Sequence, residues 1–117
     1  MSGESRAHLS LEKWAALSVD KQILNTASEL GRVKSWVVRG DRLLANQAME
    51  RSFELLDLTS EVWRKNQPVH LLRELLRLRE ALAASYISED RDAHEIRFCI
   101  KSLLDLRSST HSLDLEV

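Results

Sequence analysis

The chain has 117 residues, 44% of them hydrophobic, and its 17 basic and 18 acidic side chains leave a net charge of −1. This near neutrality excludes a global field that attracts nucleic acid or anionic lipid, so nucleic acid is not a favoured partner. Three glycines and one proline, in a chain rich in Leu, Ala, Arg and Glu, predict an all-α fold. The length suits a single domain over residues 1–117.

Targeting signals and membrane spans are not apparent. No stretch approaches the roughly 20 apolar residues that cross a membrane, and the N-terminal region lacks the apolar core of a signal peptide. We therefore expect a cytoplasmic protein without membrane contact. Cys99 is the single cysteine, and its place on an apolar helix face predicts a small buried side chain rather than a nucleophile.

Capping residues predict a short first helix and a long second one. Ser10 is a suitable N-cap for a helix over residues 11–17. Ser18, with Asp20 in the first turn, predicts the start of a helix that runs to about Val38.

The sharpest boundary in the sequence is Gly40 followed by Asp41. A glycine suits the left-handed position after a helix, and aspartate is a favoured N-cap, so one helix should end and the next begin with almost no loop. That next helix is predicted to run from about Arg42 to Lys65. Pro68 marks the first turn of another, which should end near Ile87.

The last predicted helix follows an acidic stretch. Ser88, with Glu89 and Asp90, is predicted to cap it, and its apolar periodicity ends near Arg107. Residues 1–9 and 108–117 show no such periodicity, so we expect frayed tails there.

Four long helices joined by short loops predict an antiparallel up-down-up-down four-helix bundle with a short extra N-terminal helix. Small residues along the apolar face of the 42–65 helix would let a neighbouring backbone approach closely. These residues are Ala45, Ala48, Ser52 and Thr59.

Several basic side chains fall inside the apolar faces. Lys34, Arg51 and Arg79 could converge in a cleft on an anionic ligand such as phosphate or carboxylate. The alternative, which we favour, is that their stems cover apolar surface while Arg79 pairs with an acid such as Asp20 or Glu95.

Acidic residues repeat along the outer face of the 42–65 helix, at Glu50, Glu54, Asp57 and Glu61. Glu54-x-x-Asp57 and Glu89-x-x-Asp92 resemble half of the magnesium-binding pattern of the all-α pyrophosphatases. The Glu-x-x-Glu half is absent, so we expect a solvated charged face, with no metal and no cofactor.

One alternative is enzymatic. Five residues separate Arg64 from His70 in Arg64-Lys-Asn-Gln-Pro-Val-His70, which resembles the ribonuclease motif of small HEPN-type helical domains. The resemblance implies RNA cleavage, with His70 as the general base toward a 2′-hydroxyl and Arg64 stabilising the phosphorane charge.

Three large apolar residues fall on polar helix faces. Trp36, Leu43 and Phe98 are therefore interface candidates. Nucleotide-binding glycine loops, Ser-His-Asp groupings and Cys-x-x-Cys pairs are absent from the sequence. We expect an interaction module that forms a homo-oligomer or docks to a partner protein, and that is not an enzyme.

Overall fold

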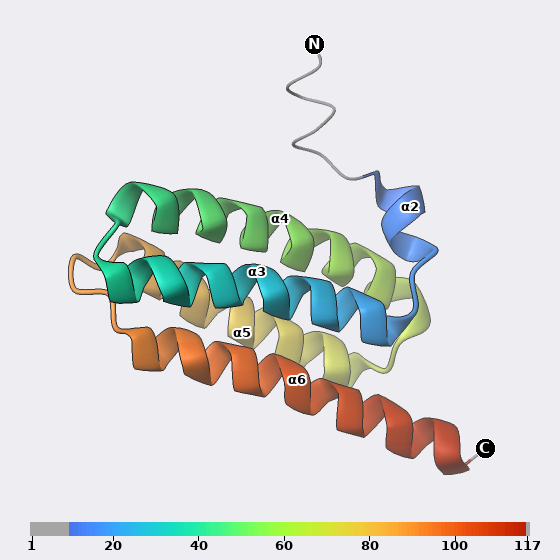
Figure 1. Cartoon of the computed structure of the whole chain (residues 1–117). Coiled ribbons are helices and arrows are strands. Elements are labelled where there is room, and N and C mark those ends of the chain that lie inside the picture. The colour runs from blue at the N-terminus through green and yellow to red at the C-terminus, as the bar shows by residue number, and fades with distance from the viewer. Residues whose placement is uncertain (1–9, 117) are drawn as a thin grey trace.

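The computed structural model describes residues 10–116, with side chains up to residue 107. These residues form five helices and no strand, which confirms the all-α prediction (Figure 1). The helices are α2 (Leu11–Ala15), α3 (Val19–Arg39), α4 (Arg42–Asn66), α5 (Val69–Ile87) and α6 (Ala93–Glu116). The predicted frayed segment 1–9 lies outside the described residues.

The first helices begin at the predicted caps. The hydroxyl of Ser10 accepts a hydrogen bond from the Lys13 amide, and that of Ser18 accepts one from the Lys21 amide, each at 3.1 Å. Each serine thereby satisfies one of the amides that a helix start leaves without an internal partner.

The boundary at Gly40 and Asp41 is also confirmed. Gly40 has a φ angle of 77°, and the amide of Asp41 donates a hydrogen bond to the carbonyl of Trp36 at 3.0 Å. The Asp41 carboxylate then accepts from the Leu44 amide at 3.0 Å, so α4 starts at once.

The prediction for the start of the last helix was wrong. Its N-terminal cap is Asp92, whose carboxylate accepts from the His94 amide at 2.9 Å. The hydroxyl of Ser88 instead accepts from the Asp90 amide at 3.3 Å, and this local turn competes with helix formation.

The helix α6 also extends past the end expected near residue 107, to Glu116. Residues 108–116 contain neither glycine nor proline, so nothing in the backbone chemistry terminates the helix there.

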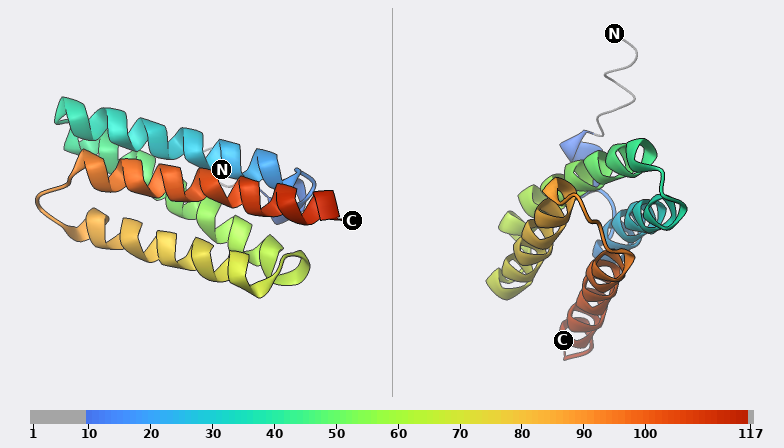
Figure 2. Two further views of the ribbon diagram at one scale, coloured as in Figure 1. Left: turned by 90° about the horizontal axis from the view of Figure 1, so that it is seen from below. Right: turned by 90° about the vertical axis from the view of Figure 1, so that its left-hand side faces the viewer.

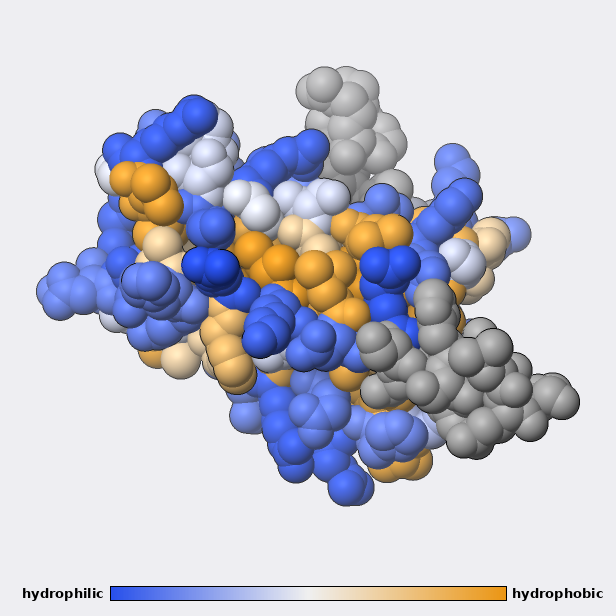
Figure 3. Space-filling model, turned by 60° about the horizontal axis from the view of Figure 1, so that its bottom comes forward, coloured by the Kyte–Doolittle hydropathy of each residue, from blue (hydrophilic) through white to orange (hydrophobic). Residues whose placement is uncertain are grey.

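The four long helices lie side by side around one core. The helix α3 packs against α4 and α6, and α5 packs against the same two neighbours (Figures 1 and 2). The predicted small residues of α4 (Ala45, Ala48, Ser52 and Thr59) are all buried. Apolar side chains also gather in the middle of the face shown in Figure 3, surrounded by hydrophilic ones. No helix among the described residues is long and apolar enough to cross a membrane.

A buried hydrogen-bond network joins α2, α3 and α4. The Gln22 amide nitrogen donates to the carbonyl of Trp14 at 3.0 Å, and the Gln22 amide oxygen accepts from the Trp63 indole at 2.8 Å. The Trp14 indole donates to the Thr59 hydroxyl at 2.9 Å. Because both indole N–H groups have acceptors, the two tryptophans can be buried without an orphan donor.

Two inter-helix connections lie at the same end of the molecule. The α3–α4 turn (residues 40–41) and the α5–α6 connection (residues 88–92) both stand at the left of Figure 1. We call this the connection end.

Candidate functional site

Arg51 is part of an ion-pair cluster between α3 and α4. Its Nε lies 3.1 Å from Oε2 of Glu29, whose other oxygen lies 2.8 Å from Nη1 of Arg32. The Glu29 side chain is only 8% exposed. Sequence analysis did not single out Glu29, and the only sign of this cluster in the sequence was a basic residue, Arg51, within the apolar face of its helix.

Arg79 can lie on the apolar face of α5 because it forms an ion pair with Asp57 of α4. The Nε–Oδ1 distance is 2.6 Å and the Nη2–Oδ2 distance is 3.3 Å, so the pair is bidentate. The hydrogen bond to Asp57 raises the pKa of the guanidinium. The guanidinium carbon also lies 5.1 Å from the centre of the Phe53 ring.

The favoured interpretation of Arg79 as a structural ion pair is therefore confirmed, whereas the named partners, Asp20 and Glu95, were wrong. The predicted outward face of α4 turns partly toward α5, and this places Asp57 within reach. Arg51 lies in the α3–α4 seam and Arg79 in the α4–α5 seam. Lys34 is half-buried on α3. The structure therefore places the two arginines in different seams, each beside a carboxylate.

Arg64 and His70 lie on either side of the α4–α5 connection, and both are exposed. Among the described residues, no hydrogen bond or ion pair joins them. The helical break at residues 67–68 separates the two side chains, so RNA cleavage stays a prediction without geometric support.

The three interface candidates lie toward the connection end, in the last turn of α3, the first turn of α4 and the second turn of α6. Leu43 and Phe98 are strongly exposed, as expected. Trp36 differs from expectation: it is half-buried against the core, and the Arg39 guanidinium lies 5.1 Å from its ring centre.

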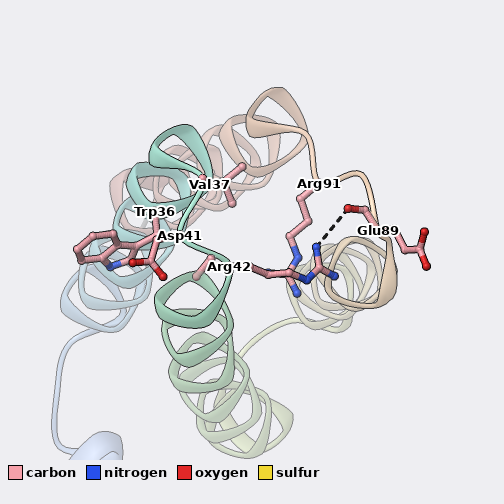
Figure 4. A pocket seen from close by; sticks show the side chains of 8 residues that line it. Trp36, Val37, Asp41, Arg42, Glu89 and Arg91 are labelled. Atoms are coloured by element: carbon pink, nitrogen blue, oxygen red, sulfur yellow. Dashed lines mark hydrogen bonds between the residues drawn. The ribbon is translucent and has the colours of Figure 1, made fainter.

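A pocket of about 260 Å³ opens at the connection end (Figure 4). Its labelled lining residues come from the end of α3, the start of α4 and the α5–α6 connection: Trp36, Val37, Asp41, Arg42, Glu89 and Arg91. Sequence analysis did not single out Arg42 or Arg91.

Main-chain carbonyls hold the Arg42 guanidinium. Its Nη2 donates to the carbonyl of Ser88 at 3.0 Å, and its Nη1 donates to the carbonyl of Glu89 at 3.2 Å. The Arg42 side chain, at the start of α4, thus joins the α3–α4 turn to the α5–α6 connection.

Arg91 is the partly buried cation of the pocket. Its Nη2 donates to the carbonyl of Tyr86 at 2.9 Å, and the guanidinium carbon lies 5.4 Å from the Tyr86 ring centre. Its Nε and Nη1 are buried without a hydrogen-bond partner among the described residues. Burial, followed by the positive charge of Arg42, lowers the pKa of this guanidinium.

The carboxylates near the pocket do not neutralise the two arginines. The Asp41 carboxylate caps α4, and the Glu89 carboxylate points away from the pocket in Figure 4. Two guanidinium groups therefore lie side by side without a shared acid, an arrangement that can bind an anion.

Other groups offer less chemistry. Among the described residues, no three His, Cys, Asp or Glu side chains gather in a way that could hold a metal ion. Cys99 is buried, as predicted, and burial, followed by the charge of Glu95, raises the pKa of its thiol. A raised pKa keeps the thiol protonated and suppresses nucleophilic reactivity.

No family model, no curated protein and no solved structure matches this chain.

Proposed function

We propose that this protein is an interaction module that pairs with a second copy of itself through the connection end. The proposal includes an up-down-up-down four-helix bundle as the frame that presents this end. The observation that carries it is the position of the exposed apolar side chains. The four most exposed large ones in the described chain all lie toward this end: Ile87 (81%), Val38 (69%), Leu43 (68%) and Phe98 (68%).

Exposed apolar groups at a helix end favour an interface because their burial removes apolar surface from water. Isolated exposed leucines and valines are common on protein surfaces and carry little meaning. Here three of the four helix termini at the connection end each contribute such a residue: Val38, Leu43 and Ile87.

The charges at the connection end favour a second copy as the partner. Arg39 and Arg42 flank Asp41 at the α3–α4 turn and leave it with a net positive charge, whereas Glu89, Asp90 and Asp92 outnumber Arg91 in the α5–α6 connection. In a two-fold symmetric pair the same surface appears twice, so the basic connection of one copy can face the acidic connection of the other.

The test is the mass in solution by light scattering across a range of protein concentrations. The wild type is expected to approach twice the chain mass of 13.4 kDa. The double variant Leu43→Ser/Ile87→Ser is expected to stay at the single-chain mass, because both changed side chains lose their apolar contact area.

Val69→Ser is the matched control, since Val69 is 66% exposed at the opposite end of the bundle. It should associate as the wild type does. A monomeric wild type, or a double variant that still pairs, would remove the connection end as a self-association surface.

A further inference from the structure

Several arginines of the described chain can be compared by the groups that hold them. Arg32, Arg51, Arg77, Arg79 and Arg107 each contact a carboxylate. Arg42 and Arg91 instead donate hydrogen bonds to main-chain carbonyls, and Arg91 also lies over the Tyr86 ring, but no carboxylate contacts either guanidinium in the described structure. A carbonyl fixes the position of a guanidinium without cancelling its charge, so these two side chains are positioned and still cationic.

The arrangement around Arg91 is costly without a further acceptor. Two of its nitrogens, Nε and Nη1, are buried and have no partner among the described residues. A buried donor without an acceptor loses its hydration and gains nothing in return. The nearby guanidinium of Arg42 adds like-charge repulsion, as the lowered pKa of Arg91 reflects.

We propose that Arg42 and Arg91 form a binding site for a small phosphate-type dianion at the connection end. Arg42 is exposed and lies beside Arg91 in Figure 4, so its guanidinium can adjust to share the anion with Arg91. The volume of about 260 Å³ is slightly below the roughly 300 Å³ at which drug-sized ligand sites begin, which suits a small anion.

The charge of the pocket favours phosphate over a simple carboxylate. Two guanidinium groups supply two positive charges, and a dianion neutralises both, whereas a singly charged carboxylate neutralises one.

The experiment is an NMR titration of the wild-type protein with inorganic phosphate at neutral pH. Sodium chloride holds the ionic strength constant. The observed signal is the Nε–H resonance of Arg91, with that of Arg73 as an internal reference. We expect a saturable shift for Arg91, and sodium acetate in place of phosphate should bind about tenfold more weakly.

Two variants test the assignment, with circular dichroism to check the fold of each. Arg42→Gln and Arg91→Gln should each weaken phosphate binding about tenfold or more, read for Arg91→Gln from the Trp36 indole N–H resonance. Arg73→Gln removes an exposed arginine from the first half of α5 and should bind as the wild type does.

The proposal is overturned if phosphate produces no saturable shift, if acetate binds as tightly, or if a folded Arg42→Gln variant retains wild-type affinity. It does not rest on self-association. The solution mass is measured separately from the Arg91 resonance, so either proposal can fail while the other stands.

Discussion

At the scale of single residues, the two glutamates that form ion pairs differ in burial and in their number of partners. Glu29 is nearly buried and contacts two arginines, one from its own helix and one from α4. Glu74 makes the same kind of contact with the arginine three residues later, Arg77, but its side chain is 50% exposed. Solvent screens the exposed Glu74–Arg77 pair more than the ion pairs of Glu29. The two glutamates should therefore differ in their contribution to stability.

Glu29→Ala and Glu74→Ala form a matched comparison. We expect Glu29→Ala to lower the free energy of unfolding by about 1–2 kcal/mol, because a charged hydrogen-bond acceptor is lost in a buried position. Glu74→Ala should change it by about 0.5 kcal/mol or less. Urea denaturation followed by circular dichroism measures both, and equal effects would show that the burial of Glu29 adds nothing.

At the scale of the elements, single turns decide where the helices begin and end. Ser10, Ser18 and Asp41 each accept a hydrogen bond from an amide three residues later, and Gly40 adopts the left-handed conformation between α3 and α4. These interactions span only a few residues, so the sequence pattern predicts them well.

The two described glycines should respond in opposite directions to the same substitution. An added Cβ meets no atom within 4 Å at Gly31 or Gly40, so packing does not separate them. Gly31→Ala, inside α3, should raise the free energy of unfolding by about 0.5–1 kcal/mol through helix propensity. Gly40→Ala should lower it by about 1–2 kcal/mol, because φ is positive there. Thermal melting of both variants measures the pair, and a stabilising Gly40→Ala would contradict the proposed role of this turn.

At the scale of the whole molecule, Gln22 connects three helices. It is nearly fully buried and binds the carbonyls of Trp14 and Leu17 as well as the indole of Trp63. The five-residue α2 is too short to be stable alone, so its position depends on this network and on the burial of Trp14.

Gln22→Met tests that dependence, since methionine keeps a similar shape and removes the polar groups. We expect a loss of about 2–4 kcal/mol in the free energy of unfolding, because the Trp63 indole loses its acceptor and the carbonyls of Trp14 and Leu17 each lose a side-chain donor. The exposed Gln47→Met is the control and should change stability by about 0.5 kcal/mol or less. Hydrogen exchange should show the amides of α2 losing protection first, and unchanged exchange there would contradict this account.

Much of the fold was predictable from the sequence, whereas little of the candidate site was. Helix positions, the Gly40–Asp41 break and the burial of the small residues on α4 follow from spacing and local capping. The prediction of Ser88 as a helix cap was wrong because its hydroxyl accepts a hydrogen bond within a short turn of the connection. No local sequence pattern marked Arg91 as a pocket residue, because it lies in an acidic stretch that is typical of a solvated loop.

The sequence by itself determined which residues are helical and which faces are apolar, because capping and periodicity act within a turn or two of the chain. Only the tertiary structure decided which charges meet. Arg42 reaches the carbonyl of Glu89, 47 positions away, and Arg79 reaches Asp57, 22 positions away. Such contacts depend on how each helix is rotated about its own axis, and that rotation is fixed only when all the apolar faces pack together.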